Sequence, residues 1–320
     1  MTGGGNQRQQ TVLVTGAAGF IGSALCGPLG AAGHAVVGFD DLSRGRQEYV
    51  PAGVHLVEGD IRDGRALDAA VAAARPDCVI HLAAMHFIPE CIARPADTIA
   101  VNVDGTARVL EACRRHGVGR VVFASSAAVY APHDGPCHED RTPLAPLEVY
   151  GESKLAAERL VAAFQAETGT ACTILRLFNA IGRRETNPHV IPHVFESLQK
   201  SATIPLGNVA PRRDYIDTRD IAAAILAVAF DGDGLRTFNV GTGITYSVSD
   251  VVERLRHILG RSIRVEQDPA RLRPTDRMVL AADIGAIRRA TGWTPRLSLD
   301  DTLRDLAVAY GLQVQPFPAA

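Results

Sequence analysis

Eight residues near the amino terminus read Thr15-Gly16-Ala17-Ala18-Gly19-Phe20-Ile21-Gly22. They follow an apolar, β-branched run and precede an alanine- and leucine-rich run, which is the strand, turn and helix order of a dinucleotide-binding fingerprint. In that order Gly16 permits a tight turn, Gly19 lets a pyrophosphate approach the backbone, and Gly22 lets the helix pack on the sheet. The phosphates would rest on the free N–H groups at the start of the helix, beside Phe20 and Ile21. The alternative is a glycine-rich turn that holds no ligand.

Beyond this turn, short β-branched runs alternate with longer alanine- and leucine-rich segments. This alternation is typical of βαβ units and a mostly parallel sheet. The predicted strands are 11–15, 35–40, 55–58, 78–82, 120–125 and 171–177, and the predicted helices are 22–32, 64–74, 98–116 and 150–168. The strands carry few polar alternations, as expected where helices cover both faces. The sequence therefore predicts an α/β fold with a Rossmann-type doubly wound parallel sheet.

After Asn179 the pattern loosens. Charged residues and prolines fill 182–192, and 204–213 is predicted to be an extended segment and loop. Further helices are expected at 217–229, 249–259 and 300–310, and one more strand at 237–240. We expect a cofactor-binding domain over 11–178, to which 214–240 returns, and a smaller C-terminal lobe from 179–213 and 241–320.

Composition narrows the class of partner. The 320 residues carry a net charge of −2 and are 47% hydrophobic, which fits a soluble globular protein. Neither a basic patch for nucleic acid nor an apolar run of ~18 residues for a membrane is present, so we expect small-molecule partners. Six scattered cysteines without a CxxC pair indicate a reducing, cytoplasmic setting. The polar, glycine-rich residues 1–10 lack the apolar core of a signal peptide and are expected to be a frayed leader.

Two further residues point to proton chemistry. Tyr150 and Lys154 are four positions apart in a predicted helix, so they share one helical face. An adjacent ammonium favours the phenolate and lowers the tyrosine pKa, which would make the phenol a proton acceptor. Standing alone, such a pair would more often be an ordinary exposed tyrosine and a solvated lysine.

Asp40 indicates which dinucleotide is bound. It ends the second predicted strand, 24 positions after Gly16, where a carboxylate would accept hydrogen bonds from the adenosine ribose hydroxyls. A carboxylate repels a 2′-phosphate, so NAD is favoured over NADP. Arg44 weakens this preference slightly, because an arginine could accommodate that phosphate. The alternative is that Asp40 is a turn residue.

Several segments together carry a family resemblance. They are TGxxGxxG, Asp60-Ile61, His81-Leu82-Ala83-Ala84, Asn102-Val103-Asp104-Gly105-Thr106, Ser125-Ser126 and YxxxK. From Val12 to about Tyr310 the chain resembles the extended short-chain dehydrogenase/reductases. The resemblance implies that Asp60 and Ile61 lie against the adenine, and that the turn Leu82-Ala83-Ala84 lies against the cofactor. It also implies that Asn102 braces the backbone of the active site. For Asp60 the alternative is a cap of the following helix.

The resemblance also implies a reacting centre. The Ser126 hydroxyl and Tyr150 would straddle one sugar carbinol, and Lys154 would bind the nicotinamide ribose and lower the tyrosine pKa; Ser125 is the alternative to Ser126. Family members that are dehydratases place an Asp-Glu pair after this hydroxyl residue, and the related decarboxylases keep a glutamate there. This chain has Ala127 and Ala128. Oxidation must then be followed by return of the hydride, as in a 4-epimerase.

Substrate contacts are implied in the second half of the chain. The resemblance assigns Asn179, Arg213 and Arg273 to the diphosphate and Asp276 to the nucleotide ribose, which makes the smaller lobe nucleotide-sugar-binding. The alternatives are surface salt bridges and a turn aspartate. The loop 85–91 departs from the family pattern, and its His86 would face the cofactor phosphate or the substrate, or be a plain loop histidine. No metal site is expected, because the His, Cys and Asp residues in 133–140 match no zinc spacing.

The resemblance is to the nucleotide-sugar 4-epimerase type of this family. It implies an isomerase with bound NAD that inverts C4 of a UDP-hexose, glucose/galactose or a derivative such as the uronic acid, through a transient 4-keto intermediate. The alternatives are a nucleotide-deoxysugar reductase that consumes NADPH and a dinucleotide sensor without catalysis. Members of the family often dimerise through the helices predicted at 98–116 and 150–168, so a homodimer is expected.

Overall fold

The main sheet consists of parallel strands. The computed structural model describes residues 9–271 and 277–316. Seven strands follow the order β11-β7-β5-β4-β1-β2-β3, and each neighbouring pair is parallel. The strands are β1 (Thr11–Thr15), β2 (Ala35–Asp40), β3 (His55–Glu58), β4 (Cys78–His81), β5 (Arg120–Ser126), β7 (Ala171–Leu177) and β11 (Leu235–Val240). The order reverses between β1 and β4, as in a Rossmann sheet. The predicted doubly wound α/β fold is confirmed.

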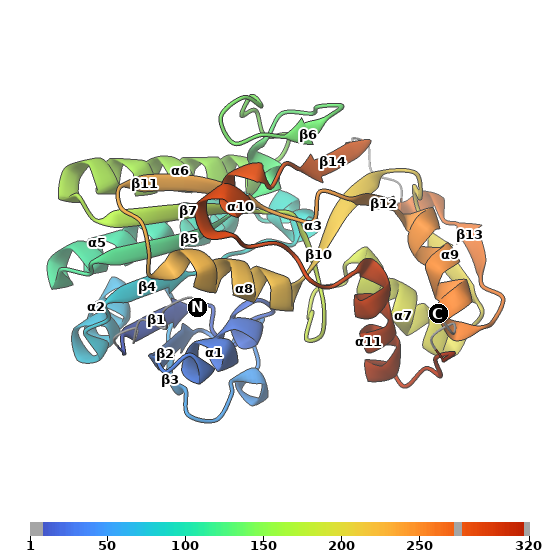
Figure 1. The fold of residues 1–320 in the computed structure, drawn as a ribbon, viewed down its shortest axis with the longest axis horizontal. Coiled ribbons are helices and arrows are strands. Elements are labelled where there is room, and N and C mark those ends of the chain that lie inside the picture. The colour runs from blue at the N-terminus through green and yellow to red at the C-terminus, as the bar shows by residue number, and fades with distance from the viewer. Residues whose placement is uncertain (1–8, 272–276, 317–320) are drawn as a thin grey trace, which may run out of the picture.

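Helices cover both faces of this sheet (Figure 1). One face carries α1 (Gly22–Ala31), α8 (Thr218–Ala229) and α10 (Gly285–Thr291), and the other carries α2 (Gly64–Ala74), α5 (Thr106–His116) and α6 (Val149–Thr168). Side chains alternate between the faces of a strand. Val12 and Val14 accordingly join the core under α1 and α8, whereas Leu13 joins the core under α2, α5 and α6.

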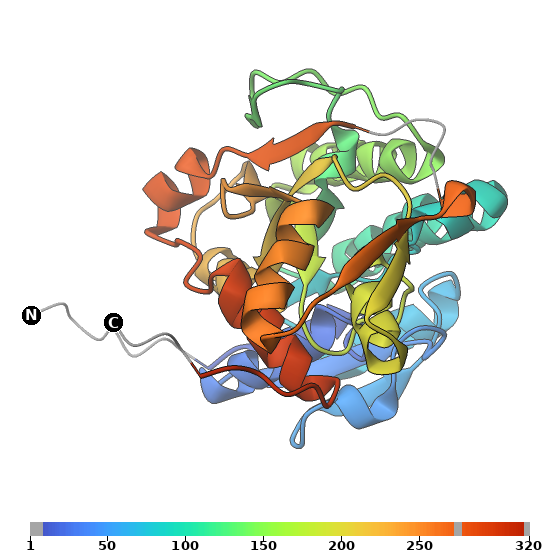
Figure 2. The ribbon, with the colours of Figure 1, turned by 90° about the vertical axis from the view of Figure 1, so that its right-hand side faces the viewer.

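A third core lies at the far end of the molecule, where Figure 2 shows α7, α9 and α11 together. It is formed by α7 (Val190–Lys200), α9 (Val248–Leu259) and α11 (Leu299–Ala309). A second sheet runs β12 (Thr245–Ser247), β10 (Arg212–Asp217), β14 (Val279–Ala282), β6 (Pro136–Cys137), with β8 (Asn179–Ile181) paired to β10. Two more strands, β9 (Thr203–Leu206) and β13 (Arg264–Gln267), pair with each other.

Strand β10 connects this end to the main sheet. Its last residue, Asp217, caps α8 by accepting a hydrogen bond from the Arg219 N–H at 2.8 Å. The same buried carboxylate accepts from the Thr302 hydroxyl on α11 at 2.8 Å. Because α8 packs against α1, one continuous segment contacts both the third core and the helical layer of the main sheet.

The predicted helix 98–116 is wrong as a single element. The chain forms α3 (Ile88–Ala93) and α4 (Pro95–Ile99), then a π-helical segment η2 (Ala100–Gly105), and only then α5. Asn102 lies in this wide turn, where its Oδ1 accepts from the Met85 N–H at 2.8 Å and its Nδ2 donates to the Met85 carbonyl at 2.9 Å. The bracing role expected for Asn102 is confirmed. Such π-turns recur at functional sites.

The second half differs most from expectation. Helix α7 begins at Val190 inside the segment predicted to be irregular, and Pro192 lies in its first turn, where a missing N–H costs nothing. The short 3₁₀ segments are η1 (Gln47–Tyr49), η3 (Ala127–Val129) and η4 (Pro269–Arg271). Within residues 9–271 and 277–316, each helix is too short or too polar to cross a membrane. The proposed ligands Arg273 and Asp276 lie outside the described residues.

Candidate active site

A cavity of about 1430 Å³ opens at the carboxyl ends of the parallel strands, where ligands bind in open α/β sheets. It gathers every predicted cofactor residue, namely Gly16, Gly19, Phe20, Ile21, Gly22, Asp40, Asp60, Ile61, Leu82, Ala83 and Ala84. The predicted reacting and substrate residues within the described chain line the same cavity, namely Ser126, Tyr150, Lys154, Asn179 and Arg213. Folding therefore brings the two predicted groups into one space.

The glycine-rich turn is built for close backbone approach. Gly16 has φ +73°, and a Cβ there would lie 2.8 Å from the backbone nitrogen of Ala83. A Cβ on Gly22 would lie 2.0 Å from the carbonyl oxygen of Gly16. A side chain at Gly22 would collide with the turn itself, and one at Gly16 would collide with the backbone that follows β4. The cradle at the start of α1 consequently depends on glycine.

Two aspartates border this cradle. The Asp40 carboxylate accepts from the N–H groups of Ala18 and Leu42, both at 2.9 Å, and burial raises its pKa. Asp60 instead pairs with Arg62 at 2.6 Å, which lowers the pKa of Asp60. The alternative role of Asp60 as a helix cap is wrong, because Asp63 caps α2.

Ser126 and Tyr150 meet at the cavity wall. Ser126 ends β5, and Tyr150 lies in the first turn of α6. Burial raises the pKa of Tyr150 to about 12, and a hydrogen bond with Ser126 partly opposes this rise. The alternative residue Ser125 is directed into the core, where its hydroxyl donates to Glu158 at 2.5 Å. The geometry therefore brings Ser126 together with the phenol.

Lys154 does not lower the pKa of Tyr150 as expected. The Lys154 ammonium lies 4.6 Å from the centre of the Phe123 ring. The pKa of Tyr150 is instead set by burial, by the hydrogen bond with Ser126, and by the charges of Cys91 and Glu148. The expected direction is wrong here because desolvation of a buried phenol disfavours its charged form. Burial also lowers the pKa of Lys154 to about 8, with Glu158 opposing this change.

This lowered pKa predicts a pH dependence of stability. Between about pH 8 and the ordinary lysine value near 10.5, the unfolded chain binds more protons than the folded chain. The free energy of unfolding therefore rises with pH in that window, and the gain is lost as pH falls through about 8. Urea denaturation should show Lys154→Met to be more stable than the parent by at least about 1 kcal/mol near pH 7, with a smaller difference near pH 9.5.

The exposed Lys200 at the end of α7 provides the control. Lys200→Met should follow the parent at both pH values. A Lys154→Met variant whose stability runs parallel to the parent across this range would contradict the assignment of the shift to Lys154.

Comparisons with known proteins bear on this geometry. Residues 12–241 match the NAD dependent epimerase/dehydratase family. The chain belongs to this family. A UDP-glucose 4-epimerase of Azospirillum brasilense is 37% identical over 309 residues, which cover 89% of this chain and 87% of that one.

Solved structures are similar over almost the whole chain. The UDP-glucose 4-epimerase of Brucella ovis in complex with NAD gives a TM-score of 0.87 at 31% identity and covers 95% of this chain and 99% of that one. MoeE5 in complex with UDP-glucose and NAD gives a TM-score of 0.84 at 32% identity, and the match covers 94% of this chain and 98% of that one. MoeE5 has also been solved with UDP-glucuronic acid and NAD.

Behind the reacting residues, this family member has a buried ionic network that the sequence did not reveal. Arg176 on β7 makes two hydrogen bonds to Glu158 on α6, at 2.9 and 2.8 Å, and both side chains are buried. The Tyr130 hydroxyl donates to Asn239 on β11 at 2.7 Å and lies 3.1 Å from Arg176. The network joins α6, which carries Tyr150, to two strands beneath it.

A second arginine at the cavity was also missed. Arg277 is only 9% exposed and donates to the Ala128 carbonyl at 3.0 Å. Among the buried side-chain atoms of the described residues, its Nη1 and the Glu148 Oε2 have no hydrogen-bond partner. Both side chains line the cavity. Its position directly after the predicted Arg273 to Asp276 segment was the available signal.

Arg213 and Asn179 lie in the neighbouring wall. The Arg213 side chain on β10 donates to the backbone carbonyl of Arg277 at 2.7 Å. Asn179 begins β8, which pairs with β10 through Tyr215. The structure thus brings Asn179 on β8, Arg213 on β10 and Arg277, just before β14, to the wall of one cavity.

His86 is not a plain loop histidine. It lies just before α3, lines the cavity, and is hydrogen-bonded through Nε2 to the Asn187 side chain at 3.1 Å. His189 lies beside it, with ring centres 5.7 Å apart. The sequence did not connect these residues, because about a hundred positions separate them.

Proposed function

We propose that the chain is an NAD-dependent nucleotide-sugar 4-epimerase that inverts C4 of a UDP-hexose through a transient 4-keto intermediate. One observation carries this proposal: Ser126 and Tyr150 meet at the carboxyl edge of the sheet, and the two positions that follow Ser126 are the alanines Ala127 and Ala128. Its similarity over most of its length to UDP-glucose 4-epimerases supports the same activity. Glucose/galactose is the proposed hexose pair, and a uronic acid derivative is the variant that the MoeE5 complex suggests.

The residues present fit NAD. Gly16 and Gly22 allow the backbone to pack so closely that a Cβ would collide with it, and the backbone N–H groups at the start of α1 suit a pyrophosphate. Asp40 at the end of β2 favours free ribose hydroxyls over a 2′-phosphate. When bound, the nicotinamide accepts a hydride from C4 and returns it.

The side chains then divide the proton chemistry. Ser126 holds the C4 oxygen, and Tyr150 removes the hydroxyl proton and later gives it back. The high pKa of Tyr150 means that nearby positive charge is needed before the phenol can act as a base at neutral pH. The oxidised nicotinamide, when bound, would supply this charge, and Lys154, one helical turn further along α6, is proposed to hold the cofactor ribose.

The two residues that follow Ser126 bear on the outcome of oxidation. Ala127 and Ala128 cannot remove or donate a proton, so the 4-keto sugar has no partner there for eliminating water. Reduction from the other face of the ketone inverts C4, and this requires the sugar to turn over within the cavity. Asn179, Arg213 and Arg277 are proposed to hold the diphosphate during this turn, since a guanidinium fork suits phosphate oxygens. Arg273 and Asp276 remain proposed ligands.

The function is tested by incubating the purified chain with UDP-glucose, UDP-galactose, their N-acetyl forms and UDP-glucuronate, followed by NMR of the C4 configuration. We expect interconversion of at least one pair, NAD that stays with the protein, and no net consumption of reducing equivalents. Consumption of NADPH would indicate the reductase instead. A chain that retains dinucleotide but changes no sugar would indicate the sensor, and the epimerase proposal would fail.

The assembly, setting and division of the chain are further proposals. A homodimer through α5 and α6 is proposed, to be checked by light scattering. The six cysteines are all free and buried, which supports a reducing, cytoplasmic setting. We propose a cofactor-binding domain of 11–178 and 214–240 and a substrate lobe of 179–213 and 241–320, which the separate cores support except at α10 and Trp293, which pack in the core of the main sheet.

A further inference from the structure

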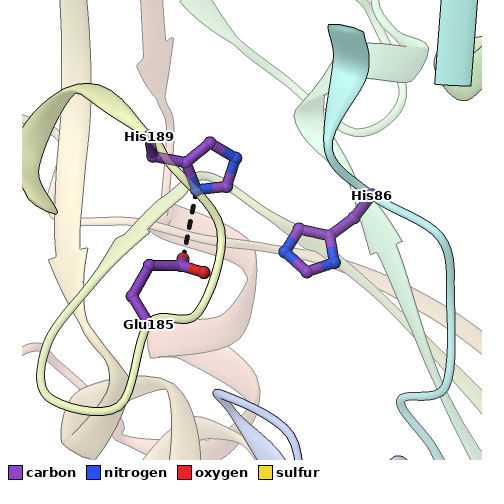
Figure 3. A group of neighbouring side chains, drawn as sticks. All are labelled: His86, Glu185 and His189. Atoms are coloured by element: carbon purple, nitrogen blue, oxygen red, sulfur yellow. Dashed lines mark hydrogen bonds and ion pairs between the residues drawn. The ribbon is translucent and has the colours of Figure 1, made fainter. Parts of the chain in front are cut away.

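Three side chains with metal-binding atoms converge on one wall of the cavity (Figure 3). His86 comes from the segment between β4 and α3, whereas Glu185 and His189 come from the segment between β8 and α7. One ligating atom from each lies within 4.8 Å of the other two. Nδ1 of His189 and Oε2 of Glu185 are already 3.1 Å apart.

The His86 ring is held in a defined orientation. The His86 ring makes a hydrogen bond to the backbone of Ala84. Its Nε2 lies 3.1 Å from the Asn187 Nδ2. Histidines that bind metals usually donate their second ring N–H to a backbone carbonyl or a carboxylate in this way. The Asn187 amide also contacts Glu185 at 3.3 Å, so its oxygen could become a further ligand if the amide rotated.

The carboxylate of the cluster is buried, which raises its pKa, but His189 and His86 outweigh this and lower the pKa overall. The Glu185 side chain is 6% exposed, and within the described chain its ion pair is with His189 alone. Its other hydrogen bonds come from the backbone and side chain of Asn187. A buried carboxylate is normally paired with a fixed positive charge or bound to a metal, and no lysine or arginine within residues 9–271 and 277–316 takes that role.

We propose that His86, Glu185 and His189 form a binding site for a divalent transition-metal ion such as Zn²⁺, Co²⁺ or Ni²⁺. Two imidazoles and one carboxylate suit these ions and leave coordination positions open, here toward the cavity. By binding all three side chains, the ion would link the loop that follows β4 to the segment that precedes α7. The three ligands line the same cavity as Ser126 and Tyr150, but metal binding is measured directly, so its outcome does not depend on C4 epimerisation.

The test uses the full chain, freed of any histidine tag and treated with a chelator. Titration with Co²⁺, followed by visible d–d absorption, should give one ion per chain, and calorimetry with Zn²⁺ should give the same stoichiometry. His86→Ala, Glu185→Gln and His189→Ala should each weaken binding by at least about tenfold. His193→Ala is the matched control, because His193 lies one turn further along α7 and bonds the Pro205 carbonyl at 2.9 Å; it should bind Co²⁺ like the parent.

A second measurement needs no variant. Diethyl pyrocarbonate modification, mapped by mass spectrometry, should spare His86 and His189 when Co²⁺ is present and should leave the modification of His193 unchanged. Two results would overturn the proposal and leave only a hydrogen-bonded network. One is no stoichiometric binding of Co²⁺ or Zn²⁺, and the other is binding and protection that do not involve His86 and His189.

Discussion

Tyr150→Phe is expected to lower kcat by about 10³-fold while leaving the cofactor bound. A positioned acid or base contributes about 10² to 10⁴ in rate, and the proposed mechanism asks this one hydroxyl to move the proton in both half-reactions. Phenylalanine keeps the ring that fills the buried site. Turnover should be measured by NMR of the C4 configuration, and retained NAD by absorbance of the denatured supernatant.

Tyr246→Phe is the control for this result. Tyr246 lies on β12 outside the cavity, so loss of its hydroxyl should leave kcat within about twofold of the parent. A Tyr150→Phe enzyme with undiminished turnover would remove the phenol from the mechanism. Loss of NAD in that variant would instead assign Tyr150 to cofactor binding.

Gly22→Ala is expected to yield no chain that binds the dinucleotide. The new Cβ would lie 2.0 Å from the Gly16 carbonyl oxygen and 2.8 Å from the Ala17 Cα, and both are backbone atoms that cannot rotate aside. The start of α1 would have to move away from the turn, which removes the N–H cradle at that helix end. Calorimetry with NAD and thermal denaturation should together show loss of binding and a lower Tm.

The same helix offers a matched control. Gly30 is exposed near the end of α1, and a Cβ there meets nothing within 4 Å. Gly30→Ala should bind NAD normally and gain up to about 1 kcal/mol, because alanine has the better helix propensity. If Gly22→Ala bound NAD and unfolded like Gly30→Ala, the expected collision of the Gly22 Cβ with the Gly16 carbonyl would be contradicted.

The first half of the fold was predictable because its signals are local. Buried parallel strands appear as short apolar runs, and β1, β2, β3 and β7 begin and end where the sequence placed them. The interruption before α5 was not predictable in this way. Helical periodicity continues through 98–116, and the π-turn becomes visible only through the contact of Asn102 with Met85.

The candidate site was predictable where one motif contains the residues. The glycine turn, Ser126 and Tyr150 each lie next to a strand or helix end that positions them. The direction of the Tyr150 pKa was wrong, because burial depends on side chains that pack from elsewhere in the fold. Arg277 and the pair His86 and His189 were missed for a related reason, since long-range folding alone brings them to the cavity.

Strand β10 has a consequence for how the molecule moves. It carries Arg213 at the cavity and ends at Asp217, which is bonded to both α8 and α11. Any swing of the third core relative to the main sheet would have to break the buried Asp217 contact with α11 or its cap on α8, so these hydrogen bonds oppose independent rotation of the two parts.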